Sequence, residues 1–393
     1  MLRLSRLVAA GYLILCLVSV GLMAVIGPLG YAPYPLPLGP SREPIGISIA
    51  YSVEKEPWLK EAVGRFNAEG GSVNGRPIRI SLEPATESRE TLNQIARGER
   101  TPVAFSPASS LQIELLQSAW EATGKTGKLV GDEPPLPLVL SPLVIVAWQE
   151  RATLLWQNEG AFWNDLHDAV AADDGWVRFG KPEWGLVKFS HARPTRSDSG
   201  IQTLVLLAYG YHNKASGLTS GDIDNPDFQK WLLDIEKSVI KFDDNGSSLM
   251  QSMVLSGPGT YDLATVYENV ALQDIDKGQS RSGQDLHIYY PPVTVISDHP
   301  FVVLNAPWVT PAQREAALAF RNYLLGPEMQ RLALQHGFRP ANAAVALVSD
   351  DPNNPFNKYQ RYGLQIYISQ QVALPAADVL NKLSLLWQEQ VNR

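Results

Sequence analysis

Residues 45–67 read IGISIAYSVEKEPWLKEAVGRFN, which joins a strand pattern directly to a helix pattern. Residues 45–51 form a continuous β-prone run, whereas apolar side chains recur at helical spacing from Leu59 to Phe66. Pro57 lies where the first helical turn begins, a position that tolerates its fixed backbone and missing N–H. The segment therefore predicts a buried strand that leads straight into a helix.

The same alternation of strand and helix patterns recurs along the chain. It is seen in RPIRISLEP (76–84), SRETLNQIARGE (88–99), PVAFS (102–106), ASSLQIELLQSAWEA (108–122), PLVIVAW (142–148), GLVKFS (185–190) and IQTLVLLAYGY (201–211). Alternation of this kind is typical of a parallel sheet covered by helices. The sequence therefore predicts the α/β class.

Proline-rich composition indicates two places at which the chain passes from one compact body to another. The first is near Ser141, in GDEPPLPLVLSPLVIVAW, and the second lies between Pro291 and Pro300. Two lobes are also expected from the length of the chain. We therefore expect lobe I from residues 45–142 and 296–393, including the terminal helix ADVLNKLSLLWQEQVNR, and lobe II from residues 143–295.

The N-terminus carries an uncharged apolar run, LVAAGYLILCLVSVGLMAVI (residues 7–26), that is long enough to cross a bilayer as a helix. Arg3 and Arg6 precede it, and the positive-inside tendency keeps them in the cytoplasm. We expect residues 1–27 to be a transmembrane signal-anchor that places the rest of the chain outside the cytosol, with cleavage left open. Residues 28–44 are rich in proline and predict a stiff, extended spacer.

Composition and motifs exclude several classes of function. The chain has 33 basic and 40 acidic side chains, so we expect no nucleic-acid partner. Its single cysteine, Cys16, lies in the apolar run, so disulfides cannot support the domain. The motifs of a hydrolase nucleophile elbow, a P-loop and a dinucleotide loop are missing, and the histidines lack zinc-site spacing. We therefore expect no enzyme activity, no cofactor and no metal.

Several segments follow one another in an order that is known from other proteins. They are IGISIAYSVEKEPWLKEAVGRFN, PVAFSPASSLQIELL, LSPLVIVAW, FSHARPTRSDSGIQTLVLLAYGY, YDLATVYENVAL, SDHPFVVLNAPWVTPAQREAALAF and HGFRPA. In this order the chain resembles the type II extracellular (periplasmic-type) solute-binding proteins, in particular the molybdate and oxyanion receptors of ABC transporters. The resemblance implies two α/β lobes with two hinge crossings, and a ligand in the cleft between them.

Polar residues follow two predicted strands of lobe I, just before helices. Ser52 and Glu54 follow the first strand, and Ser109 and Ser110 follow PVAFS. Hydroxyls and backbone N–H groups at a helix N-terminus can hold a dehydrated oxyanion. All four residues are therefore candidate ligand-binding residues, with helix capping as the alternative for Ser109 and Ser110.

In lobe II, ARPTRSDSG joins a polar turn to a strongly apolar helix. Arg196, Ser197 and Ser199 lie at the N-terminus of that helix, and Arg196 can offer a planar fork to a carboxylate or oxyanion. Gly200 would let a ligand approach the backbone closely. We expect this turn to bind the ligand, although SDSG is also a common capping pattern.

Three more residues complete the candidate site. Tyr267 and Glu268 end the segment YDLATVYE, and the resemblance to the solute-binding family carries a ligand role onto this pair. The alternative is a core tyrosine beside a solvated glutamate. Ser141 lies at the predicted crossing, where it contributes a hydroxyl to the ligand or sets the hinge.

Carboxylates leave the sign of the solute's charge open. Glu54, Asp198 and Glu268 would repel an anion inside a closed cleft unless they point away from it. We favour an oxyanion narrowly, and a cationic or metal-containing solute is the alternative.

The expected function is that of an extracytoplasmic, monomeric receptor. It captures a small molecule or ion by hinge closure and presents the closed form to a membrane permease or sensor. The rival hypothesis is a membrane-anchored structural or sensory module with a degenerate cleft.

Overall fold

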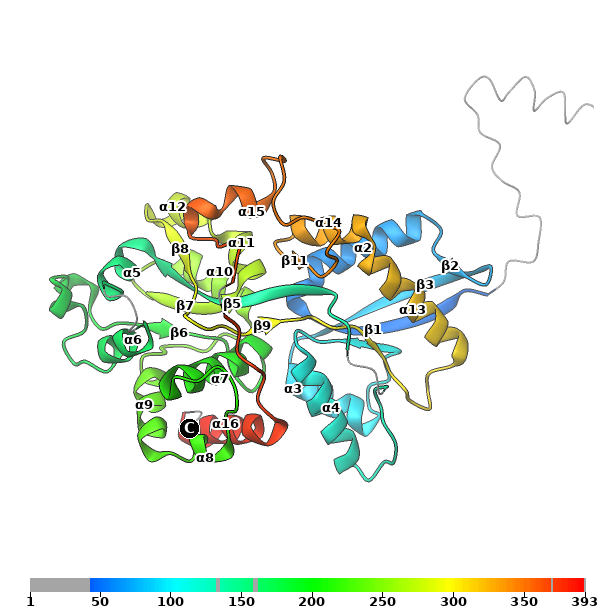
Figure 1. Ribbon diagram of the computed structural model, residues 1–393, viewed down its shortest axis with the longest axis horizontal. Helices are drawn as coiled ribbons and strands as arrows, with labels where there is room; N and C mark the ends of the chain where they lie inside the picture. The colour runs from blue at the N-terminus through cyan, green and yellow to red at the C-terminus, as the bar shows by residue number, and fades with distance from the viewer. Residues whose placement is uncertain (1–42, 132–134, 158–161, 369, 392–393) are drawn as a thin grey trace, which may run out of the picture. The chain divides into compact units, whose positions relative to one another are not determined.

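The computed structural model describes residues 43–131, 135–157, 162–368 and 370–391. The expected signal-anchor, residues 1–27, and the spacer up to residue 42 lie outside the described residues. Within the described ranges, no helix is both long and apolar enough to cross a membrane. Residues from Pro44 onward form one compact unit, in which two sheets are each covered by helices (Figure 1).

The first sheet is largely parallel, as the strand–helix alternation predicts. Its strands are β1 (Ile45–Ser52), β2 (Ser72–Val73), β3 (Arg76–Ala85), β4 (Ala104–Ser106) and β10 (Val302–Val303), in the spatial order β10-β4-β1-β3-β2. β1 pairs in parallel with β3 and β4, whereas the edge strands β2 and β10 are antiparallel to their neighbours. This sheet and its helices form the first lobe.

Helices of the first lobe begin and end where local sequence signals indicate. They are α2 (Glu56–Ala68), α3 (Ser88–Arg97), α4 (Ser110–Ala122), α13 (Pro311–Leu325) and α14 (Pro327–Gln335). α2 has Pro57 in its first turn, and Thr310 caps α13 through a reciprocal capping box with Gln313. The strand–helix unit predicted from residues 45–67 is therefore confirmed.

The second sheet is mixed and not parallel. It contains β5 (Val139–Trp148), β6 (Phe189–Ser190), β7 (Leu263–Tyr267), β8 (Leu286–Tyr289), β9 (Ile296–Ser297) and β11 (Arg339–Pro340). β5 runs antiparallel to β7 and β8, and only β6 is parallel to β7 among the pairs described in this sheet. The expectation of a parallel sheet is wrong here, because β5, which enters from the first lobe, runs in the opposite direction to its neighbours β7 and β8.

β5 and β9 form the connection between the two sheets. They pair antiparallel, with Ser141 opposite Ser297 and Pro142 opposite Ile296, and β11 pairs with the start of β5. Figure 1 shows β5 as a long strand that extends from the second sheet toward the first. The predicted lobe boundaries at residues 142 and 296 fall on this pair of strands.

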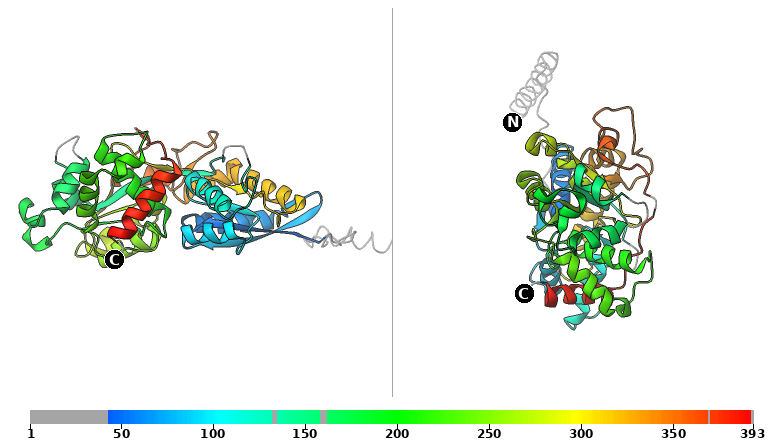
Figure 2. Two further views of the ribbon diagram at one scale, coloured as in Figure 1. Left: turned by 90° about the horizontal axis from the view of Figure 1, so that it is seen from below. Right: turned by 90° about the vertical axis from the view of Figure 1, so that its left-hand side faces the viewer.

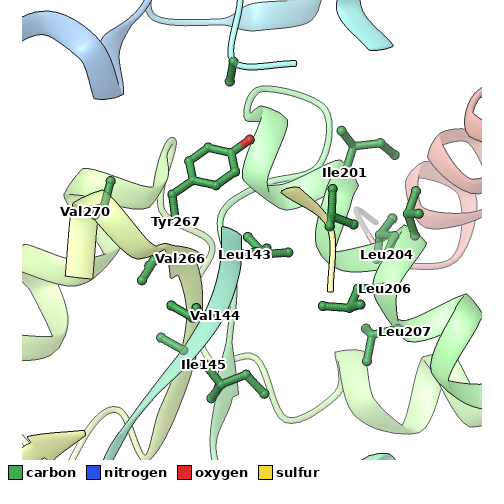
Figure 3. Close-up of a cluster of buried hydrophobic side chains, with 14 of the residues drawn as sticks. Leu143, Val144, Ile145, Ile201, Leu204, Leu206, Leu207, Val266, Tyr267 and Val270 are labelled. Carbon is green, nitrogen blue, oxygen red and sulfur yellow. The ribbon is translucent and has the colours of Figure 1, made fainter. Parts of the chain in front are cut away.

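The second lobe buries its core around α7. Its helices are α5 (Gln149–Leu155), α6 (Phe162–Val170), α7 (Asp198–His212), α8 (Ser220–Ile223), α9 (Pro226–Glu236), α10 (Gly246–Ser256), α11 (Glu268–Asp274) and α12 (Lys277–Ser282). α7 is buried from Asp198 to Tyr209. Figure 3 shows its leucines in one apolar cluster with Leu143 and Val144 of β5. A short helix, α15 (Pro355–Lys358), lies near the end of the chain.

The terminal helix, α16 (Ala377–Gln390), packs mainly on the second lobe and not on lobe I, where we expected it. It contacts α7 and α8, and Trp387 Nε1 donates a hydrogen bond of 2.9 Å to Glu236 Oε2 in α9. Both views in Figure 2 show it (red) beside the green helices of that lobe. Its apolar face, which includes the buried Leu383 and Trp387, finds its core there.

Candidate functional site

Turns from both lobes converge where the strands of the first sheet end. We name this place the interlobe recess and define it by Ser52, Glu54, Lys55, Ala108, Asp198, Tyr267 and His299, all of which are buried. The residues come from the ends of β1, β4 and β7, the start of α7 and the segment after β9. The carboxyl ends of parallel strands and the N-termini of helices meet here, as is typical of ligand sites in α/β proteins.

Hydrogen bonds between the chain's own groups connect the lobes at the recess. Ala108 N of the first lobe donates to Asp198 Oδ2 of the second, at 3.2 Å. Nearby, Ser88 N donates to Arg196 O at 2.9 Å, and Asn269 Nδ2 donates to the backbone oxygen of Glu54 at 3.4 Å. The lobes are therefore closed against each other.

Lys55 places a buried ammonium in the recess. It lies in the short 3-10 turn that joins β1 to α2. Its Nζ donates to Ser52 Oγ at 2.8 Å and to the backbone oxygens of Ser106 and Pro107 at 2.9 and 2.7 Å. His299 Nδ1 lies 3.3 Å from the same Nζ and accepts when Lys55 is charged. Oxygen and nitrogen acceptors therefore surround this ammonium.

Two buried carboxylates share this single ammonium. Burial, together with the charge of Asp198, raises the pKa of Glu54 to about 7. Burial also raises the pKa of Asp198 to about 6, against the opposing effects of the Ala108 N–H, the Ser88 side chain and Lys55. Burial lowers the pKa of Lys55 to about 7, although the nearby carboxylates oppose this shift. The recess is thus poised to change its charge near neutral pH.

Three buried polar atoms in the recess lack hydrogen bonds to any described residue: Asp198 Oδ1, Tyr267 Oη and His299 Nε2. The rings of Tyr267 and His299 pack edge to face, with centroids 5.6 Å apart. Figure 3 shows the Tyr267 hydroxyl directed away from the apolar core, toward the start of α7 and the first lobe. Buried polar groups are rarely left unpaired, so these atoms indicate a place for a bound polar group.

His299 adopts an unusual backbone conformation next to these atoms. Its φ is +40°, in the left-handed region that non-glycine residues seldom occupy. Burial lowers the pKa of His299 well below its usual value, and Lys55 adds to this effect. The imidazole is therefore neutral, and when Nδ1 accepts from Lys55 the unpaired Nε2 carries the proton.

The N-terminus of α4 is already occupied by the chain's own oxygens. Ser109 Oγ accepts from Leu111 N at 3.2 Å and so caps the helix. Ser110 N donates to Asp298 Oδ1 at 2.8 Å, and the Ser110 hydroxyl bonds to the same carboxylate. Since Ala108 N is bound to Asp198, the donors that we expected to hold an oxyanion are engaged by the chain's own carboxylate and hydroxyl oxygens.

The residues at the start of α7 have different roles. Arg196 is 42% exposed in its side chain, and its Nη1 donates to Asp244 Oδ1 at 2.9 Å. The buried hydroxyls of Ser197 and Ser199 lie 3.0 Å apart and bond to each other. Asp198 between them points into the recess, whereas the Arg196 guanidinium is engaged at the surface.

Gly200 is required by the packing of the chain itself. A Cβ at this position would lie 2.3 Å from the backbone oxygen of Ala192 and 2.8 Å from the backbone carbon of Arg193. The close approach that we expected between Gly200 and a ligand is therefore made by the protein's own turn.

Glu268 and Ser141 fasten the second lobe near the crossing. The Glu268 carboxylate accepts from Arg339 Nε and Nη2 at 2.8 and 2.7 Å and also bonds to the Tyr290 hydroxyl. Ser141 Oγ donates to Asn269 Oδ1 at 2.9 Å and accepts from Asn269 N at 3.1 Å. Both side chains have these partners within the protein.

The structure brings together Ser52, Glu54, Ser109, Ser197, Ser199 and Tyr267 around or beside the recess. Lys55 and His299 also line the recess, although they are not among the predicted ligand-binding residues. Lys55 directly follows Glu54 in a strand-to-helix turn, and His299 precedes Pro300 at the second crossing. Both positions could have been found by considering every polar side chain at the predicted turns and crossings.

Little space is left between the lobes. A cavity of about 20 Å³ is lined by Ser88, Gln112, Asp198 and their neighbours, which is room for about one water molecule. A larger pocket of about 580 Å³ lies elsewhere, beside Trp163 and Tyr211 of the second lobe. In the part of the chain that the structure describes, no group of three His, Cys, Asp or Glu side chains could hold a metal ion.

Comparisons with known proteins place this geometry in context. The chain is 24% identical over 292 residues to an uncharacterized protein of Mycobacterium tuberculosis, covering 72% of this chain and 40% of that relative's length. In fold it is similar to the sulfate-binding protein SubI from Mycobacterium tuberculosis, with a TM-score of 0.54, 19% identity and coverage of 85% of this chain and 96% of that one.

A periplasmic thiamin binding protein has a TM-score of 0.59 and 14% identity, with coverage of 91% of this chain and 99% of that one. These structural likenesses show the two-lobed α/β fold and leave the oxyanion branch undecided. The family model described as "Bacterial extracellular solute-binding protein" matches residues 47–339. The chain therefore belongs to the bacterial extracellular solute-binding protein family.

Proposed function

We propose that this chain is an extracytoplasmic receptor that captures a small solute in the interlobe recess by closing its two lobes. The observation that carries the proposal is the convergence of polar groups from both lobes at one buried place. Ala108 of the first lobe already bonds there to Asp198 of the second, and Tyr267 Oη and His299 Nε2 are buried without described partners.

Hinge closure is the proposed mechanism. β5 and β9, which pair near Ser141, are the connecting strands about which the lobes would turn. A solute would stabilise the closed state by its additional affinity for that state. The closed form would then be recognised by a membrane permease of the ABC transporter type or by a sensor, with the N-terminal segment as a tether and the receptor as a monomer.

We propose that no covalent chemistry accompanies binding. Lys55 is the side chain in the recess that most resembles a nucleophile. Its Nζ is surrounded by Ser52 Oγ, two backbone oxygens and His299 Nδ1, which hold it in place. A group that donates all its hydrogens to fixed acceptors is suited to balance charge.

A second candidate function is a structural or sensory module that closes without any solute. The small cavity of about 20 Å³ and the direct bonds between the lobes favour it. In that case Asp198 itself would occupy the place of the ligand at the N-terminus of α4.

Tyr267→Phe tests the receptor hypothesis, with Tyr209→Phe as the matched control. The Tyr267 hydroxyl has no described partner, whereas Tyr209 Oη donates to Ala373 O at 2.6 Å. Tyr267→Phe should leave stability unchanged and weaken solute binding about fivefold, the effect of one hydrogen bond. Tyr209→Phe should lower stability by about 1 kcal/mol and leave affinity unchanged.

The measurements are calorimetric titration with a panel of ions and metabolites, and small-angle scattering with and without each solute. Binding accompanied by a change in the radius of gyration supports the receptor. A radius that stays constant, with no binding by any member of the panel, favours the self-closing module.

A further inference from the structure

We infer that the solute carries a cationic N–H donor, a protonated amine or an amidinium group, that binds beside Asp198 and Glu54. This inference rests on the proposed receptor function and names the class of its solute. It reverses the narrow preference for an oxyanion that the sequence supports.

Charge balance in the recess is the first argument. Glu54 and Asp198 are 5% and 3% exposed, and among the described residues Lys55, at 0% exposed, is the ammonium that acts on both carboxylates. Asp298 adds a further carboxylate, whose charge also acts on Lys55. With its carboxylates ionised the recess carries excess negative charge in a medium of low dielectric constant. A cationic solute would neutralise this charge, whereas an anion would increase it.

The hydrogen-bonding inventory is the second argument. The N–H groups of Ala108, Ser110 and Leu111 are bound to the chain's own oxygens, so they are not free to hold an anion. Asp198 Oδ1 is a fully buried acceptor without a partner among the described residues, and Tyr267 Oη can also accept. These are the atoms that an N–H donor with a positive charge requires.

His299 Nε2 restricts the solute further. It is buried, unpaired within the described part of the chain, and packed beside the ring of Tyr267. Because it acts as a donor when Nδ1 accepts from Lys55, it suits an acceptor atom on the same solute. A solute with one cationic N–H group and one nearby oxygen would satisfy all three unpaired atoms.

An ammonium fits the recess better than a metal ion does. The chain already holds the ammonium of Lys55 there with one hydroxyl and two carbonyl oxygens at 2.7–2.9 Å. No cluster of three ligating side chains is found in the described ranges. The cavity of about 20 Å³ shows that the lobes must separate before such a solute enters.

Calorimetric titration with matched pairs of probes tests the inference. Two amines, 1,4-diaminobutane and 4-aminobutanol, are each compared with the uncharged 1,4-butanediol. Sulfate, phosphate and Zn²⁺ represent the other classes of solute. Each amine should bind at least about tenfold more tightly than the diol, since the gain is a charge-assisted hydrogen bond. Sulfate, phosphate and Zn²⁺ should not bind in the recess.

Asp198→Asn and Glu54→Gln are the test variants, and Asp244→Asn is the matched control. Asp244 is an exposed carboxylate that pairs with Arg196, a residue of the turn that also carries Asp198. Its loss therefore leaves the recess intact. Each test variant should weaken amine binding about tenfold or more, and the control should change it less than about twofold. Two test variants are used so that a failure of one to fold leaves the other informative.

The outcomes separate the inference from the proposed function. Binding of sulfate, phosphate, Zn²⁺ or the diol in preference to the amines overturns the cationic class and leaves the receptor function standing. Amine binding that Asp198→Asn and Glu54→Gln leave unchanged overturns the placement. Absence of binding by every probe, with lobes that stay closed in solution scattering, overturns the receptor function itself.

Discussion

Asp198 and Asp262 are both buried carboxylates of the second lobe, and they are treated very differently by their surroundings. Asp262 is fully buried, and both of its oxygens are satisfied. Oδ1 bonds to Arg151, and Oδ2 accepts from Trp176 Nε1 at 2.9 Å and from Lys188 N at 2.8 Å. Asp198 Oδ2 accepts from Ala108 N across the lobes, whereas Oδ1 has no hydrogen-bond partner in the part of the chain that the structure describes.

The difference separates a buried charge that is fully paired within the fold from one that, in the receptor we propose, binds the solute. A buried carboxylate that is fully paired inside one lobe is part of that lobe's core. A buried carboxylate that lacks a hydrogen-bond partner on one oxygen, lies between the lobes and has a raised pKa destabilises the fold when no partner is bound. Asp262 is therefore a structural group, and we propose that Asp198 is a ligand-binding one.

Replacing Asp262 should have the largest effect on stability. Asp262→Ala leaves Arg151 buried without its carboxylate and Trp176 Nε1 without its acceptor. We expect the free energy of unfolding to fall by about 3–5 kcal/mol, the usual consequence of breaking a buried ion pair. Urea denaturation followed by circular dichroism measures it. A loss of less than about 1 kcal/mol would remove the distinction between the two carboxylates.

Changing the pH should have a clear effect on amine affinity. Glu54 and Asp198 have pKa values raised to about 7 and about 6, and the pKa of Lys55 is lowered to about 7. Raising the pH from about 6 to about 8 therefore ionises both carboxylates and discharges Lys55. Tyr267, whose pKa burial raises well above 10, and the neutral His299 do not change charge in this window.

Both changes make the recess more negative, so the affinity for 4-aminobutanol should rise about tenfold or more over this range, with one proton released on binding. Titration at several pH values, in buffers of differing ionisation enthalpy, measures both the affinity and the proton release. A binding constant that is flat or falls with rising pH would indicate an anionic or neutral solute.

The smallest expected effect is that of Asp198→Asn on stability. Folding raises the pKa of Asp198 from 3.8 to about 6. The ionised carboxylate therefore destabilises the folded state above about pH 6, whereas in acid Asp198 is protonated and has no such effect. The variant should match the wild type at about pH 4 and gain up to about 1 kcal/mol at about pH 8. Urea unfolding at the two pH values tests this sign, and a loss of several kcal/mol would make Asp198 structural like Asp262.

Local signals in the sequence predict much of the fold. The unit of β1 and α2, with Pro57 in the first helical turn, and the cap of α13 at Thr310 follow from neighbouring residues and are confirmed. The antiparallel pairing of β5 with β7 and the position of α16 depend on contacts between distant segments. Local patterns do not encode those contacts, so both expectations were wrong.

The sequence predicts where several polar residues of the recess lie along the strands, and their ligand-binding role stays a prediction. Ser52, Glu54 and Tyr267 lie at or just after strand ends, as the residue pattern predicts. The partners of these residues could not be predicted from residue types, because a serine-containing turn before a helix can hold either an oxyanion or a carboxylate of the chain itself. Only the structure shows that Asp198 and Asp298 occupy the donors of α4.

Native mass spectrometry of the gently purified protein tests most directly whether the interlobe recess holds a cationic solute. We predict a retained small molecule that contains a protonated amine or amidinium group, that is released on unfolding and whose occupancy is much lower in Asp198→Asn. A retained sulfate, phosphate or other anion, or a retained amine at the same occupancy in Asp198→Asn as in the wild type, would contradict the account.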